Sequence, residues 1–229
     1  MIESSSCGFS AHVAMFNHLL QPTMRPTLLP TELSTISNAI TTEPTSFRLL
    51  SNTPTQAEPV AQVTLTATKD TCINDEFPYR NYGTSEELRV DNWPKSWSFL
   101  TFDGSSVISS IARQTLQVLQ ATLRLYSLDE GGNASFFALP NLKEWSETSL
   151  TWNNEDQIDR SGEYQVGSLD WAEQFLWSEI DVTTAFANGF GTDFLTSFVI
   201  VSESTNGVTF ASREKDSGLF SPELVLSIG

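Results

Sequence analysis

Apolar and polar residues alternate in short runs from Val63 to the end of the chain. Residues 63–68 place Val, Leu and Ala between threonines, which is the pattern of a strand with one buried face. Ten further runs predict strands at residues 88–90, 97–102, 116–126, 135–139, 149–152, 164–166, 175–180, 196–201, 208–211 and 223–228. Turn residues separate them. This succession of short strands predicts an all-β fold of two packed antiparallel sheets.

Two local signals add detail to these strands. Asn206-Gly207 lies between two β-branched and aromatic runs, residues 198–201 and 208–210, which predicts a hairpin. Residues 105–112 and 182–187 have the pattern of short helices instead.

Residues 145–154 combine two tryptophans with a short Thr/Leu run and a polar ending. We interpret Trp145 and Trp152 as core and corner residues that flank the strand at 149–152. Asn153 and Asn154 then close a turn.

The first 60 residues differ from the rest of the chain. They are rich in Ser, Thr and Pro, have no sustained period, and carry prolines at a spacing that prevents a long helix or a central strand. We therefore predict an extended leader at residues 1–60 and a sandwich domain at 61–229. Most simply the leader is a solvated linker. Its two apolar patches would dock on their own domain or add a donated strand to another copy, through Val13, Met15, Phe16, Phe47 and Leu49.

The formal net charge of −16 opposes binding to nucleic acid, which needs Lys and Arg to neutralise phosphates. No run of 18 apolar residues exists, so no membrane span is predicted. Cys7 and Cys72 are the two cysteines. They would form one disulfide in an oxidising compartment, and two unpaired thiols are the alternative.

A set of motifs in the order seen here resembles the DNRLRE family of secreted domains over residues 63–229. The motifs are Tyr82-Gly83-Thr84-Ser85 with Leu88-Arg89-Val90, residues 98–103, residues 121–126, the 145–154 stretch, Asp181-Val182-Thr183, residues 210–214 and residues 222–226. The resemblance implies a jelly-roll-like antiparallel β-sandwich on extracellular proteins. It also implies similarity to carbohydrate-binding modules associated with alginate, some with calcium sites.

Catalysis is disfavoured by the distribution of histidine. His12 and His18 are the only two, and both lie in the leader, so the sandwich has no histidine for a Ser/His/Asp triad or a zinc site. Carboxylate pairs that suit glycoside hydrolysis arise throughout so acidic a chain. We predict a protein that is not an enzyme.

Four tryptophans are candidate stacking platforms for sugar rings, with burial in the core as the alternative for each: Trp93, Trp97, Trp171 and Trp177. Calcium is the one cofactor considered. Its candidate oxygen ligands are Asp70, Asn74, Asp75 and Glu76, and a solvated turn is the alternative for them. The acidic surface opposes an anionic polysaccharide such as alginate unless calcium bridges the two. Asn133-Ala134-Ser135 is a glycosylation sequon.

Two functions follow from these features, both at the cell surface or outside the cell. In the first, the protein is a structural or adhesive subunit that forms a homo-oligomer or filament through its leader. In the second, it is a carbohydrate-binding module that recognises a cell-wall or matrix polysaccharide.

Overall fold

The computed structural model describes residues 61–105, 117–142, 144–187 and 195–229. Its strands are β1 (Ala61–Asn74), β2 (Glu87–Asn92), β3 (Lys95–Asp103), β4 (Val118–Tyr126), β5 (Gly131–Ala138), β6 (Tyr164–Ala172), β7 (Trp177–Asp181), β8 (Leu195–Val201), β9 (Val208–Ala211) and β10 (Glu223–Ile228). Three short 3-10 helices are η1 (Trp152–Gln157), η2 (Thr183–Phe186) and η3 (Lys215–Gly218). Every pairing between these strands is antiparallel, which confirms the predicted all-β antiparallel sandwich.

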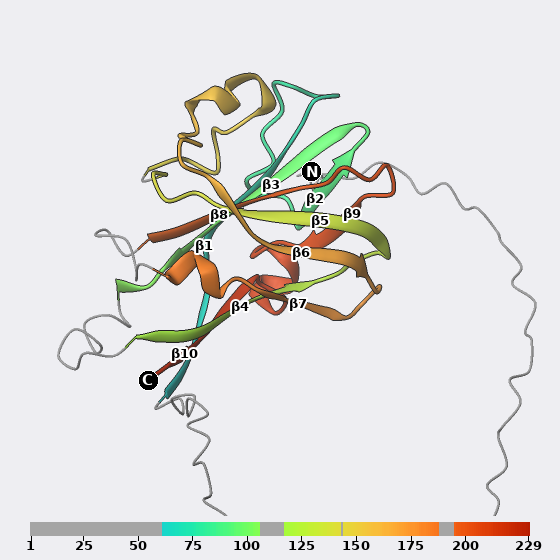
Figure 1. Ribbon diagram of the computed structural model, residues 1–229. Coiled ribbons are helices and arrows are strands. Elements are labelled where there is room, and N and C mark those ends of the chain that lie inside the picture. The colour runs from blue at the N-terminus through green and yellow to red at the C-terminus, as the bar shows by residue number, and fades with distance from the viewer. Residues whose placement is uncertain (1–60, 106–116, 143, 188–194) are drawn as a thin grey trace, which may run out of the picture. The chain divides into compact units, whose positions relative to one another are not determined.

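Strand β1 belongs to both sheets of the sandwich (Figure 1). Its first half pairs with β10, which is followed by β4 and β7, and its second half pairs with β3, which is followed by β8, β5 and β6. A register shift between Ala67 and Lys69 separates the halves. Such a bulge reverses the side-chain alternation. Accordingly Leu65 and Ala67 lie in the main core between the sheets, whereas Ile73 lies in a second apolar cluster.

The sheet of β3 and β8 is buried on both faces. Leu100 of β3 and Ile200 of β8 belong to the main core, while their neighbours Phe99 and Val199 belong to the second cluster. Residues between β5 and β6 cover this second face by contributing Leu139, Leu142, Leu150 and Ile158. A strand that is covered on both sides reads as a continuous apolar run, which explains why these strands do not alternate.

The predicted strand at residues 149–152 is wrong. Residues 147–149 form a turn, and η1 begins at Trp152. The Asn154 side chain accepts a hydrogen bond from the Thr151 N–H at 2.7 Å, and its backbone N–H donates to the Thr151 carbonyl at 3.2 Å. This local pairing replaces a sheet partner. Trp145 and Trp152 pack against the second cluster, in agreement with their interpretation as core and corner residues.

The predicted hairpin at Asn206-Gly207 is also wrong. Strand β8 pairs with β3 and β5, whereas β9 pairs with β2, so the connection carries the chain away from β8. Neither residue has the positive φ that a type I′ turn requires. Glycine is needed at 207 for another reason, because a Cβ there would lie 2.3 Å from the Val90 carbonyl oxygen.

The remaining local predictions have mixed outcomes. The short helix predicted at 182–187 is confirmed as η2, while most of the helix predicted at 105–112 and the whole leader lie outside the described residues. Within the described part of the chain, no helix combines the length and apolar character needed to cross a membrane.

Candidate functional site

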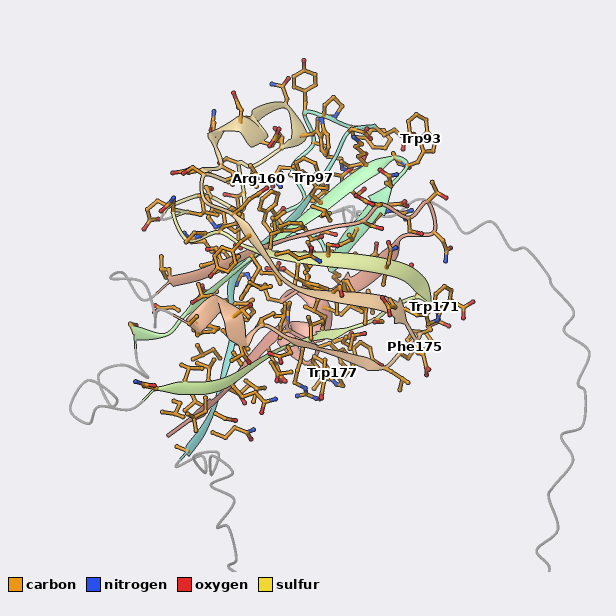
Figure 2. All side chains as sticks on the ribbon, in the orientation of Figure 1. Trp93, Trp97, Arg160, Trp171, Phe175 and Trp177 are labelled. Atoms are coloured by element: carbon orange, nitrogen blue, oxygen red, sulfur yellow. The ribbon has the colours of Figure 1, made fainter. Side chains whose placement is uncertain are left out.

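Three large aromatic side chains project into solvent at one end of the sandwich (Figure 2). Trp93 is 76% exposed, Phe175 is 59% exposed and Trp171 is 52% exposed. We call these three residues the aromatic end. Exposed rings of this size are unusual because their burial would contribute strongly to stability.

Trp93 is held by the tight turn between β2 and β3. Its backbone N–H donates to Asp91 Oδ1 at 3.1 Å, and Asp91 in turn accepts from Arg89 at 2.6 Å. The backbone N–H of Asn92 donates to the Ser204 carbonyl at 3.1 Å, which ties this turn to the β8–β9 connection. This fixed backbone leaves most of Trp93 exposed to solvent.

Trp171 lies opposite Gly132 in the β5–β6 register. A Cβ added at Gly132 would be 3.8 Å from the Trp171 ring, so the ring rests against a position that has no side chain. The Gly132 N–H donates to the Asn206 carbonyl at 2.9 Å, which joins this strand to the same β8–β9 connection. One loop, residues 202–207, is thus hydrogen-bonded both to the turn that carries Trp93 and to β5, the strand that pairs with β6 beside Trp171.

Phe175 adopts a left-handed backbone conformation with φ of 60° in the β6–β7 turn. This region is costly for a large non-glycine residue, by about 1–3 kcal/mol. The conformation is fixed by the Phe175 N–H, which donates to the Ser127 carbonyl at 2.8 Å, and by the Gln174 side chain, which donates to the Leu128 carbonyl at 3.1 Å. An exposed aromatic in a costly backbone conformation, four residues after the exposed Trp171, marks this turn as a candidate binding element.

The other two candidate tryptophans are not free platforms. Trp97 packs against Trp152 with ring centroids 4.9 Å apart, and the Arg160 guanidinium lies 4.7 Å from its ring centroid. Trp177 is covered by Tyr126 at 5.5 Å and by the Arg124 guanidinium at 4.7 Å. The structure therefore brings Trp93 and Trp171 to the surface and packs Trp97 and Trp177.

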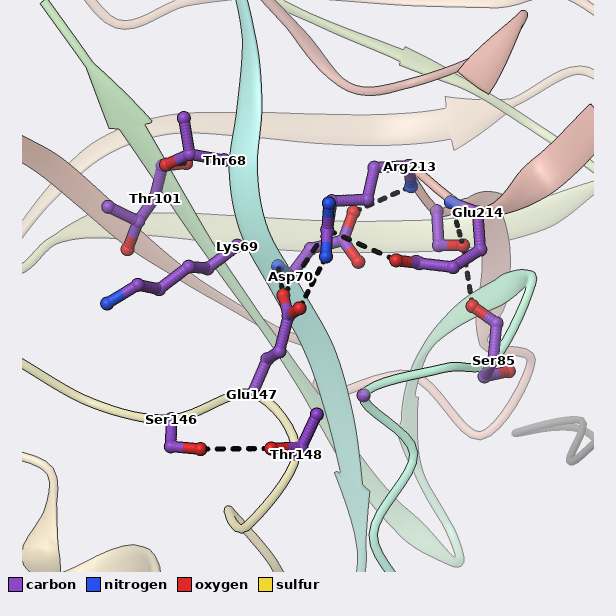
Figure 3. A network of polar contacts seen from close by, with 12 residues as sticks. Thr68, Lys69, Asp70, Ser85, Thr101, Ser146, Glu147, Thr148, Arg213 and Glu214 are labelled. Atoms are coloured by element: carbon purple, nitrogen blue, oxygen red, sulfur yellow. Dashed lines mark hydrogen bonds and ion pairs between the residues drawn. The ribbon is translucent and has the colours of Figure 1, made fainter. Parts of the chain in front are cut away.

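A polar cluster lies where β1 meets the segment after β9 (Figure 3). Arg213 forms ion pairs with Glu147 and Glu214, and its backbone N–H donates to Asp70 Oδ2 at 2.8 Å. Glu147 also accepts from the Asp70 N–H at 3.1 Å. We call Asp70, Glu147, Arg213 and Glu214 the arginine cluster. It joins the segment between β5 and β6, which covers the second apolar cluster and which we call the cover, to β1 and to the segment between β9 and β10.

Two carboxylates of the arginine cluster pair with the Arg213 guanidinium, and the third, Asp70, accepts from the Arg213 backbone N–H. Burial raises the pKa of Asp70 well above its ordinary value, and the charge of Glu214 raises it further. Burial also raises the pKa of Glu214, although Arg213 opposes that shift. The hydrogen bond with Glu147 raises the pKa of Arg213. The arrangement is structural, because these charges are used to fix backbone segments.

The candidate calcium ligands are not brought together. Asp70 belongs to the arginine cluster, and four residues of extended strand place Asn74 about 13 Å further along β1. The Asn74 side chain instead accepts from the Glu76 N–H at 2.8 Å and donates to Ser96 at 2.8 Å, as in a turn. Among the described residues no group of three or more His, Cys, Asp or Glu side chains could hold a metal ion.

The remaining candidate sites were predicted on residues that are only partly described. Cys72 is fully buried and disulfide-bonded, while Cys7 lies outside the described residues, so their pairing stays a prediction. The assembly residues are likewise outside them: Val13, Met15, Phe16, Phe47 and Leu49. Asn133 is exposed on β5, where its carbonyl accepts from the Ser202 hydroxyl at 2.7 Å.

Two features were missed from the sequence. Phe175 falls within a predicted strand, but in the structure it lies in a turn with a positive φ and is 59% exposed. The arginine cluster joins residues that are up to 144 positions apart from Asp70 to Glu214, so no local pattern indicated it.

Comparison with known proteins places residues 61–228 under one family model, carbohydrate-binding module family 96. A comparison with curated proteins gave no match.

Proposed function

The chain belongs to carbohydrate-binding module family 96, and we propose that its sandwich binds a polysaccharide through the aromatic end without cleaving it. The observation that carries this proposal is the exposure of Trp93, Trp171 and Phe175 on neighbouring segments that are joined by hydrogen bonds. Sugar rings have apolar faces that stack on flat aromatic surfaces, and rings fixed in advance lose little conformational entropy on binding.

A non-catalytic role is consistent with the residues available. The domain at 61–229 contains no histidine, and the aromatic end is formed by backbone-tied turns and not by a buried acid and base pair. We place the protein outside the cell or at its surface. The disulfide at Cys72 supports this location, because such bonds persist in oxidising compartments.

The contribution of one tryptophan ring to the binding free energy can be calculated from the exposed area that a sugar would cover. The exposed half of a tryptophan offers about 100 Å², and a sugar ring that covers one face removes about half of that from water. At about 25 cal/mol per Å² this is worth roughly 1.3 kcal/mol, or about tenfold in affinity.

The test measures retention of the full chain in native gels that contain soluble polysaccharides. Trp171→Ala and Trp93→Ala should each weaken retention by about tenfold. Tyr79→Ala is the matched control, since Tyr79 is 78% exposed but lies beside the η1 segment, where the Pro78 carbonyl accepts from the Asn153 N–H. If Tyr79→Ala and Trp171→Ala reduced retention equally, the binding site would not be the aromatic end. No retention of the unaltered chain on any polysaccharide would reject the function.

Assembly into filaments through the leader stays a prediction from the sequence, because the residues that carry it lie outside the described part of the chain. Deleting residues 1–60 tests it. Electron microscopy should show filaments for the full chain and monomers for the deletion, and filaments formed by the deletion would contradict a donated strand.

A further inference from the structure

The aromatic end is surrounded by acidic residues. Four segments meet there, namely residues 91–95, 128–132, 170–176 and 202–207, as the hydrogen bonds from Asn92 to Ser204, from Gly132 to Asn206 and from Gln174 to Leu128 show. These segments contain six acidic residues and one basic residue, Lys95.

Four of the six carboxylates reach solvent. They come from three of the four segments, and Asp170 lies on β6: Glu130, Asp170, Glu173 and Glu203. Asp170 directly precedes Trp171, and Glu173 lies two residues before Phe175. Of the two others, Asp91 is buried and paired with Arg89, and Asp129 accepts from the Thr209 N–H at 2.7 Å.

The described residues of these four segments offer no arginine to receive a carboxylate or sulfate from a sugar. Recognition of such groups relies on the paired donors of arginine or on lysine. A polyanionic chain that stacked on Trp171 would bring its charges within a Debye length, about 10 Å, of the exposed carboxylates, where screening is incomplete. The repulsion adds to that of a chain with a net charge of −16.

We infer that the ligand of the aromatic end is a glycan without anionic groups, either uncharged or amine-bearing, and not a polyuronate. This inference rests on the proposed function. Hydroxyl groups of an uncharged glycan would donate hydrogen bonds to the exposed carboxylates, and ammonium groups would pair with them.

The experiment compares the affinity of the full chain for mannan and mixed-linkage β-glucan as uncharged probes, chitosan as an amine-bearing probe, and alginate and polygalacturonate as polyuronates. Binding to at least one probe of the first two classes should be ten or more times tighter than to either polyuronate in 20 mM salt. Raising the salt to 500 mM should weaken the binding of chitosan and leave the affinity for an uncharged glycan unchanged. The salt dependence therefore distinguishes an amine-bearing ligand from an uncharged one.

A charge reversal tests whether the local carboxylates set this preference. The double variant Asp170→Lys with Glu203→Lys should bind alginate at least tenfold more tightly than the unaltered chain. The control, Glu144→Lys with Asp156→Lys, makes the same change in net charge on exposed residues of the cover and should leave alginate binding within threefold.

The outcomes distinguish a failure of the inference about ligand charge from a failure of the proposed polysaccharide binding. Tightest binding to alginate or polygalacturonate by the unaltered chain would overturn the inference while leaving a polysaccharide-binding function intact. An equal gain in both double variants would also overturn it, because net charge alone would then explain the preference. Absence of binding to every probe would overturn the function itself and the inference with it.

Discussion

Replacing Arg213 by glutamine should destabilise the fold strongly at neutral pH and much less in mild acid. Arg213 forms ion pairs with Glu147 and Glu214 and lies beside Asp70, a residue that is 1% exposed. Glutamine keeps much of the side-chain length and removes the positive charge. The variant therefore measures how much the charge of Arg213 stabilises the fold by balancing three neighbouring carboxylates.

The magnitude follows from the burial of the cluster. Removing one partner from a buried ion pair costs about 3–5 kcal/mol, since the other charge is left uncompensated. The Arg213 side chain is 35% exposed, which places the expected loss at the low end, about 3 kcal/mol at pH 7. This is a large part of the stability of an ordinary domain.

The pH dependence has a definite sign. The pKa values of Asp70 and Glu214 are raised in the folded chain, so the folded state holds protons that the unfolded state has released. Stability therefore falls as the pH rises from the unfolded pKa values near 4 through the raised folded ones. Loss of Arg213 raises the pKa of both carboxyls further, because the guanidinium charge lowers both. The cost of Arg213→Gln should shrink as the pH falls toward 4.

Urea unfolding at pH 7.5 and pH 4.5, followed by tryptophan fluorescence, measures both effects. Arg124→Gln is the matched control, because Arg124 also contacts two glutamates, Glu179 and Glu223, on the outer face of its sheet. We expect it to cost about 1 kcal/mol or less at pH 7.5. This account of the cluster would be refuted if Arg213→Gln lowered the free energy of unfolding equally at the two pH values, or by no more than Arg124→Gln does.

Three further substitutions probe the fold by thermal unfolding. Gly83→Ala should cost about 3 kcal/mol, because its Cβ would lie 2.0 Å from the Glu147 carbonyl oxygen, and an unchanged melting temperature would contradict that contact. Phe99→Ala should cost about 3–5 kcal/mol by opening a cavity under the cover, and a smaller loss would mean that the cover is loosely packed. Phe175→Asn should stabilise the chain by about 1 kcal/mol through relief of the left-handed strain while it reduces polysaccharide retention, and lower stability would show that the ring packs.

Most strands could be predicted because their side chains meet the core at every second position. Strand β10 alternates without interruption and is predicted at its full length, whereas β1 extends beyond its predicted end at residue 68 because the bulge reverses the alternation there. The hairpin at Asn206-Gly207 failed for a different reason. Glycine serves a close backbone approach to Val90 there, and the sequence signal for that use is the same as for a tight turn.

Of the exposed aromatics in the candidate site, only Trp93 is marked by a local pattern in the sequence. Trp93 is marked by the turn-like Asn92-Trp93-Pro94, and its exposure follows from that local pattern. Trp171 and Trp177 lie six residues apart in similar surroundings, yet Trp171 faces a glycine and Trp177 is covered by Tyr126. Exposure of an aromatic ring depends on what the neighbouring strand places opposite it.

By itself, the sequence determined the all-β antiparallel sandwich, because the alternation of buried and exposed positions is a local property of each strand. Tertiary structure alone decided which aromatics reach solvent, which segments meet around them, and how Asp70 joins Arg213 and Glu147. Those outcomes depend on strand order and register, which bring together residues far apart in the chain. No local pattern encodes that pairing, because it is selected by the burial of the whole core.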